Sequence, residues 1–434
     1  MRKFIIIGST LLLVFIALVY LSVSETKESF RTSEVLDIDD LDKIKFGDFD
    51  SVTVAANILY KASPLKKIMQ GEQFREAWAT PVTVPIAFLD TLKGGLKVIE
   101  EGGGKQTHSL ELEDKRGIRY TLRSLSKDPV KLVPEMAKEL GLENIVVDGV
   151  SAQHPYAALV VAKLSEAAEI LHTNPKLMFI PKQKTLGKLN EKYGNRLYFL
   201  EFESEGKVNW TALKDIKEIM DNESLLKLKL EKGEAVSIDI NAMIRARLFD
   251  LLIGDWDRHA KQWGWAVQEK DGKFTAIPVP TDRDNAFFNL GGVIPSLVAN
   301  DISHPKVQTF EKEIGFLPGL VSEFDEYFLR SGSLEQFKQE AIKLKELMTD
   351  SKIESSFKIW TKEIDSIKGP EIREKIRARR ENLVVTAEKF YGILQRRPKK
   401  DIVLKGTDEL ELTGMLAKCF DCTEEDYKFK ALEE

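Results

Sequence analysis

A run of 20 uncharged, mostly apolar residues near the N-terminus limits the possible folds of this chain more than any other feature. The run covers residues 4–23, FIIIGSTLLLVFIALVYLSV, and follows Arg2 and Lys3. At 1.5 Å per residue, a helix of this length is about 30 Å long, which matches the hydrocarbon core of a bilayer. A buried core helix is a poor alternative, because no polar stripe interrupts the run. We expect residues 1–24 to form a signal anchor or a signal peptide.

The basic flank of this run predicts its orientation. Arg2 and Lys3 favour a cytoplasmic N-terminus, so the body should lie outside the cytoplasm, in a periplasm, at a cell surface or in a secretory lumen. Ser22 and Ser24 are small enough for a cleavage site, but the run is longer than the apolar h-region of a usual signal peptide, and we favour an uncleaved anchor. The membrane is therefore the first expected partner. Asn209 and Asn222 would be glycosylation acceptors only in a eukaryotic lumen.

Charge and cysteine content exclude other classes of protein. The 434 residues carry a net charge of −5, and no basic stripe is interleaved with aromatic residues, so we expect no nucleic-acid partner. Cys419 and Cys422 are too few for a disulfide framework or a complete zinc site. The pair is compatible with a small local disulfide and equally with two free thiols.

The remaining pattern predicts an α+β chain with a strand-rich part followed by a mostly helical part. Residues 57–81 have helical spacing that ends at Pro81. Residues 97–125 alternate in three segments, which predicts three antiparallel strands. Long amphipathic stretches dominate after Val236. The predicted divisions are a linker and helical extension at 25–95, the strand-rich part at 96–205, the helical part at 206–400 and a tail at 401–434.

A predicted hairpin brings carboxylates together at the start of the helical part. Residues 238–254 form a helix with Asp239 as N-cap and Gly254 at its end. Residues 263–267 and 274–279 alternate around a turn at Asp271 and Gly272. The open end of this hairpin should therefore unite four carboxylates, those of Asp255, Asp257, Asp282 and Asp284.

Such a cluster needs positive charge, because neighbouring carboxylates raise one another's pKa. Oxygen ligands favour magnesium, manganese or calcium over zinc. The alternative is an ion-pair network in which Arg258, Arg283 and their neighbours neutralise the aspartates.

The two segments LLIGDWDRHAKQ and PTDRDNAF resemble the catalytic and metal-binding loops of the atypical kinases typified by HipA, CotH and the secretory-pathway kinases, with the phosphatidylinositol kinases as wider kin. The resemblance implies a two-lobed protein-kinase-like fold that uses ATP with Mg²⁺ or Mn²⁺. It makes Asp257 the catalytic residue and Asp282 a metal ligand, with Asp284 beside it. Gln262 replaces the metal-binding Asn of the family, and Asp255 replaces another Asn, which puts a second metal in doubt.

The resemblance requires a nucleotide site in the strand-rich part. Gly102, Gly103 and Gly104, followed by Lys105, would let backbone N–H groups approach phosphates, although the segment is not a Walker A loop. Kinases of this fold carry a phosphate-binding lysine on the strand that here holds Arg123, and Lys127 follows four residues later. The remaining candidates are Glu135 or Glu139, as a partner for that cation, and Glu201 on the expected hinge strand RLYFLEF.

The sequence thus predicts a membrane-tethered, ATP-dependent phosphotransferase acting on a hydroxyl of a protein, glycan or lipid. Asp257 would orient the acceptor, and His259 would shape the loop rather than act as a base. Two alternatives stay open: a non-catalytic module that binds a nucleotide or another ligand, and a metal-dependent phosphohydrolase. No motif of a serine hydrolase occurs.

Overall fold

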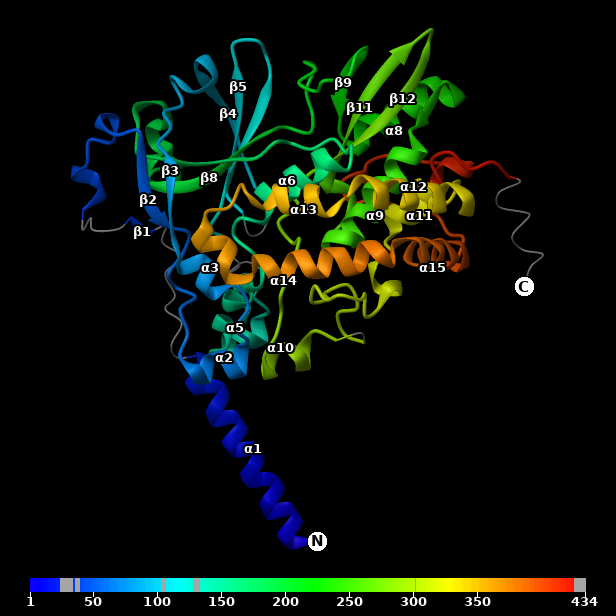
Figure 1. Cartoon of the computed structure of the whole chain (residues 1–434). Helices are drawn as coiled ribbons and strands as arrows, with labels where there is room; N and C mark the ends of the chain where they lie inside the picture. Colours follow the sequence, from blue (N-terminus) through cyan, green and yellow to red (C-terminus); the bar gives the residue numbers. More distant parts are fainter. Residues whose placement is uncertain (24–33, 36–39, 104–106, 128–132, 301, 425–434) are drawn as a thin grey trace.

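The computed structural model describes residues 1–23, 34–35, 40–103, 107–127, 133–300 and 302–424. These residues form three β-sheets and a large set of helices, which confirms a mixed α+β chain (Figure 1). The α-helices after α1 are α2 (Pro64–Gln70), α3 (Arg75–Ala79), α4 (Glu135–Glu139), α5 (Glu143–Asp148), α6 (Ala157–Ala167), α7 (Asn190–Tyr193), α8 (Asn222–Lys232), α9 (Ile240–Ile253), α10 (Val293–Val298), α11 (Glu323–Leu329), α12 (Leu334–Leu347), α13 (Asp350–Phe357), α14 (Lys362–Glu381) and α15 (Leu383–Arg396).

Helix α1 (Arg2–Val23) projects from the body (Figure 1). None of its apolar window is buried, and the helix is long and apolar enough to cross a membrane, as predicted. Its C-terminal turns contact the body, where the side-chain amide of Gln70 donates a hydrogen bond of 3.2 Å to Ser22 Oγ. A second apolar segment, Glu143–Ala167, passes the same length and hydropathy test but is two-thirds buried, which is typical of a core segment.

A five-stranded antiparallel sheet carries the predicted glycine turn. Its order is β4-β5-β6-β8-β7, and the three successive strands expected from the sequence are confirmed as its first half. Its strands are β4 (Leu96–Gly102), β5 (Ser109–Asp114), β6 (Arg119–Ser124), β7 (Lys176–Ile180) and β8 (Arg196–Phe202). One face is held by buried residues such as Leu112, Leu122 and Tyr198.

A small sheet replaces part of the expected helical extension. Strands β1 (Glu34–Val35), β2 (Ser51–Ala55) and β3 (Pro81–Pro85) pair antiparallel in that order. The prediction that this region was helical was therefore incomplete: α2 and α3 are short, and β3 begins at the proline that ends α3. In β3, alternate residues such as Val82 and Val84 are buried, which is the ordinary pattern of a half-buried strand.

A four-stranded sheet lies within the part that was expected to be mostly helical. Its order is β10-β12-β11-β9, and only the β10 and β12 pair is parallel. The predicted hairpin is confirmed, because β11 and β12 pair from Trp263 opposite Pro280 to Lys270 opposite Lys273, with Asp271 and Gly272 in the turn. Its strands are β9 (Ile216–Met220), β10 (Val236–Ile238), β11 (Trp263–Lys270) and β12 (Lys273–Pro280).

Helix α9 begins and ends where the sequence predicts. The side chain of Asp239 accepts a hydrogen bond from the amide of Ala242, and Gly254 caps the C-terminus in the left-handed region. Packed around α9 are α11, α12, α14 and α15, which form the helical core with it. The long C-terminal amphipathic stretch is two helices that meet at Asn382. Cys419 and Cys422 form a disulfide.

Candidate functional site

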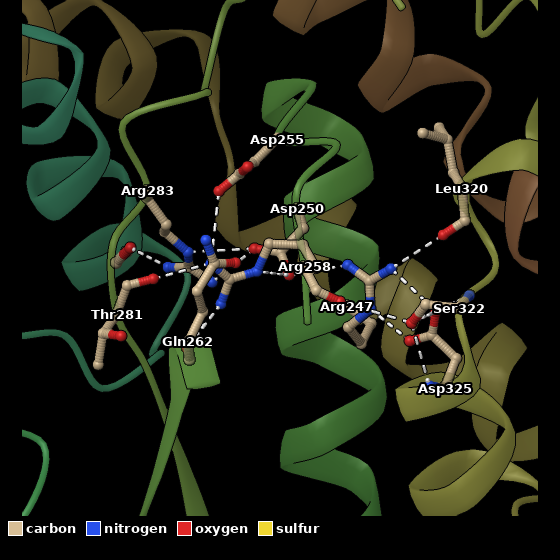
Figure 2. A network of polar contacts seen from close by, with 11 residues as sticks. Arg247, Asp250, Asp255, Arg258, Gln262, Thr281, Arg283, Leu320, Ser322 and Asp325 are labelled. Carbon is tan, nitrogen blue, oxygen red and sulfur yellow. Dashed lines mark hydrogen bonds and ion pairs between the residues drawn. The ribbon is translucent and has the colours of Figure 1, made fainter. Parts of the chain in front are cut away.

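The loop that follows α9 is fixed by a buried network of charges (Figure 2). Asp250, on the last turns of α9, is fully buried and accepts hydrogen bonds from Arg247 (2.9 Å), Arg258 (3.1 Å) and Arg283 (3.1 Å). Burial alone would raise the pKa of Asp250, but the three arginine charges outweigh it and hold that pKa below its usual value. Arg258 also donates to the backbone oxygen of Thr281 at 2.8 Å. Asp250 therefore joins the loop after α9 to the segment after β12.

Glycine is required where this loop starts. Gly254 has a φ of +71°, and a Cβ at this position would collide with the ring of Phe310. The next residue, Asp255, turns into the arginine network instead of the solvent. Its two carboxylate oxygens are buried without a hydrogen bond, and Arg258 lies 3.5 Å away. Burial raises the pKa of Asp255 well above its usual value, although Arg258 opposes the shift.

This raised pKa makes Asp255→Asn a stabilising substitution. A carboxyl with a raised folded-state pKa favours folding only while protonated, so its contribution is lost as pH rises above its unfolded value of about 4. Asparagine is neutral at every pH and has nearly the same shape. We expect the variant to be more stable than wild type at pH 7.5 by about 1 to 3 kcal/mol, with the gain shrinking toward pH 4.

Urea denaturation of the full chain in mild detergent at several pH values measures this difference. Asp250→Asn is the matched control, and it should be destabilised because its charge is paired with three arginines. A lower stability of Asp255→Asn than of wild type at pH 7.5 would contradict the raised pKa.

One open cleft of about 830 Å³ collects most of the predicted site residues. Its walls come from the five-stranded sheet, from the loop after α9 and from the segment after β12. The predicted residues that line it are Gly102, Gly103, Arg123, Lys127, Asp257, Asp282 and Asp284. At the glycine turn, Gly103 has a φ of +103°, and a Cβ there would collide with the backbone oxygen of Thr107, so the turn cannot hold a larger residue without rearrangement.

Arg123 on β6 and Lys127, three residues after the end of β6, pair with the carboxylates after β12. Arg123 Nη1 lies 3.2 Å from Asp282 Oδ2, and Lys127 pairs with Asp284. Burial works against ionisation of Asp282, but Arg123 and Lys127 hold its pKa below the usual value. Burial and the adjacent charge of Asp282 raise the pKa of Asp284 to about 6. The other oxygen of Asp282, Oδ1, is buried and has no hydrogen-bond partner.

Asp257, in the loop after α9, also lines the cleft and contacts a residue that sequence reasoning missed. Lys306 Nζ is 3.1 Å from Asp257 Oδ1 and 5.4 Å from the ring centre of Trp256. Lys306 comes from an irregular segment 49 residues further along the chain, so no periodic pattern could have indicated the contact.

Two glutamates that were not predicted from the sequence also line the cleft. Glu111, on β5, and Glu203, directly after β8, both line it. Burial and the charge of Glu203 raise the pKa of Glu111 to about 7. Strand alternation places Glu201 and Glu203 on the same face, which was the available signal.

Four predicted residues lie elsewhere or outside the described residues. Gly104 and Lys105 are outside the described residues. Glu135 is exposed on α4 and pairs with Lys138. Glu201 lies 3.6 Å from Arg123 and lines an adjoining cavity of about 40 Å³, which shares Arg123, Asp282 and Asp284 with the cleft.

Gln262 is also placed away from the cleft walls. It is buried, and its side-chain oxygen faces Arg258 Nη1 at 3.4 Å. The position that the family fills with a metal-binding Asn is thus part of the arginine network (Figure 2).

Asp282 and Asp284 could supply part of the coordination of a divalent cation, with the phosphates of a bound nucleotide supplying the other ligands. Within the described residues, no group of three or more His, Cys, Asp or Glu side chains is arranged to hold a metal unaided. Magnesium commonly uses one or two carboxylates together with substrate phosphates. Asp282, with its unpartnered buried Oδ1, and the neighbouring Asp284 fit that pattern.

Comparisons with known proteins assign no family. No family model matches the sequence, and no curated protein matches it. Among solved structures, the chain is similar to the Helicobacter pylori proinflammatory kinase CtkA, with a TM-score of 0.35 and 12% identity over 68% of this chain and 95% of that one. At that TM-score the likeness is too distant to assign a fold family or a function.

Proposed function

We propose that this protein is an ATP-dependent phosphotransferase, tethered by α1 to a membrane and acting outside the cytoplasm. The observation that carries the proposal is the shared cleft, in which Asp257 and Asp282 face the same volume as the glycine turn and two cations. Its volume of about 830 Å³ suits a nucleotide, because small-molecule sites are usually about 300 to 1,000 Å³.

The charged side chains of the cleft would make two kinds of contact with a nucleotide. Arg123 and Lys127 would exchange Asp282 and Asp284 for phosphate oxygens, with backbone N–H groups near Gly103 beside them. The carboxylates of Glu111 and Glu203 would accept hydrogen bonds from ribose hydroxyls or base N–H groups. Asp282 and Asp284 would hold magnesium or manganese, which supplies neutralisation of the phosphate charge.

The reaction needs one group to orient the acceptor. The γ-phosphoryl group of ATP passes to an acceptor hydroxyl, its bond to the β-phosphate oxygen breaks, and ADP leaves. Asp257 would orient that hydroxyl and take its proton late in the transfer. Lys306 pairs with Asp257 in the structure, and it would contact the γ-phosphoryl group during transfer.

A second groove of about 860 Å³ provides an approach for the acceptor. It meets the nucleotide cleft at Trp256, Asp257, His259 and Lys306, which line both. An acceptor on a protein, glycan or lipid could therefore reach Asp257 through this groove.

The second candidate function is a non-catalytic nucleotide-binding module. The observation that favours it is the orientation of Gln262, whose side-chain oxygen faces Arg258 instead of the cleft. In the kinases that the sequence resembles, an Asn at this position binds metal. A site in which Gln262 does not bind metal would hold one metal ion at most.

Phosphoryl transfer from labelled ATP separates these functions. We expect the purified full chain, with manganese and γ-labelled ATP, to label itself or added protein, sugar or lipid, and Asp282→Asn to abolish the labelling. ATP-dependent thermal stabilisation without transfer would favour the binding module. Release of free phosphate alone would indicate a hydrolase, and the absence of binding, transfer and release would contradict both candidates.

A further inference from the structure

Exposed apolar side chains gather on the part of the body that adjoins α1. Ile302 is 95% exposed and Leu297 63% exposed, although both are large and apolar. We call this group the membrane-facing surface; its residues are Ile68, Met136, Leu140, Val293, Leu297 and Ile302. Clustered exposed apolar residues mark an interaction site more often than scattered ones do.

Contacts between elements place this surface beside the end of α1. Helix α2, which carries Ile68, packs against both α1 and α10. The hydroxyl of Tyr20, in the last turns of α1, donates a hydrogen bond of 3.0 Å to the backbone oxygen of Leu140. Figure 1 shows α2 and α10 at the end of the body from which α1 projects.

One stretch of this surface, the one that includes α10, lacks charge where the rest of the chain is rich in it. Residues 285–300 contain no Asp, Glu, Lys or Arg, although these make up 31% of the whole chain. This stretch includes α10, with Leu297 exposed on it. A surface that faced water alone would not be expected to combine apolar exposure with an absence of charge.

We propose that the membrane-facing surface docks on the bilayer that α1 enters, with Leu297 and Ile302 inserted at the boundary between headgroups and acyl chains. The inference rests on the membrane tethering in the proposed function. Tyr20 would then lie at the interface, where tyrosine is enriched. The segment after Ile302 continues to Lys306 and Val307, which line the cleft, so docking holds the mouth of the cleft close to the lipid surface.

Fluorescence quenching by brominated lipids tests this docking in the full chain reconstituted in nanodiscs. Single cysteines at positions 297 and 302 carry the fluorophore, and the Cys419 and Cys422 disulfide is kept oxidised. The matched control is Leu230→Cys on α8, an exposed leucine (49%) at the end of the body away from α1 (Figure 1). Leu12→Cys in α1 is the positive control.

We expect quenching at 297 and 302 to exceed that at 230 by about twofold or more, because interfacial side chains penetrate about 5 to 10 Å into the headgroup and acyl boundary. Quenching at 12 but not at 297 and 302 would overturn the docking and leave the anchor standing. Absence of quenching at 12 would overturn both. A blue shift at 302 without quenching would mean that a second protein copy covers the surface, which also overturns the proposal. Phosphoryl transfer from ATP, measured on the same labelled variants, tests the proposed kinase activity separately from the docking.

Discussion

Asp257→Asn is expected to reduce phosphoryl transfer about 10²-fold to 10⁴-fold, the usual contribution of a positioned general base. The substitution keeps the size of the side chain but removes the charge that would orient the acceptor hydroxyl. Because Asp257 pairs with Lys306, whereas Arg123 and Lys127 pair with other carboxylates, ATP binding should change little. Initial rates with labelled ATP, together with calorimetric titration of ATP, measure the two effects separately.

The control for this prediction is the same change at the tip of the β11 and β12 hairpin. Asp271 is exposed in the turn with a φ of +51°, a conformation that asparagine adopts readily. Asp271→Asn should therefore retain full transfer. Retention of more than about a tenth of wild-type activity by Asp257→Asn would show that this carboxylate is not the base.

Asp250→Ala is expected to lower the free energy of unfolding by about 3 to 5 kcal/mol. The change leaves the buried guanidinium groups of Arg247, Arg258 and Arg283 without their shared carboxylate. Removing one member of a buried ion-pair network is costly because the remaining charges cannot reach water. Urea denaturation of the full chain in detergent gives the value.

An exposed ion pair serves as the control. Asp350 begins α13 and pairs with Arg380, but its side chain is 64% exposed. Asp350→Ala should shift the melting temperature far less than Asp250→Ala, because solvent-exposed pairs contribute little. A melting temperature of Asp250→Ala as close to wild type as that of Asp350→Ala would contradict the structural role of the network.

Local chemistry explains which parts of the fold the sequence could predict. The caps at Asp239 and Gly254 and the hairpin turn at Asp271 and Gly272 depend on neighbouring residues alone, and the structure confirms them. The small sheet of β2 and β3 was missed because each strand is short and its partner lies 30 residues away in sequence, as for Thr53 and Thr83.

In the candidate site, too, the features set by neighbouring residues could be predicted and the long-range contacts could not. The hairpin register predicted that carboxylates before β11 and after β12 would converge, and Asp257, Asp282 and Asp284 do line one cleft. Asp255 lies in the arginine network instead, because the turn at Gly254 directs it inward. Lys306 could not be predicted, since it reaches Asp257 through a loop with no regular periodicity.

The central claim is that Asp282, Arg123 and Lys127 bind a nucleotide together with its metal. A crystal structure of the full chain with manganese and a non-hydrolysable ATP analogue tests it most directly, because anomalous scattering locates the manganese. We expect a manganese peak beside Asp282, with phosphates bound by Arg123 and Lys127. A nucleotide bound elsewhere, or manganese bound away from Asp282, would contradict the proposed function.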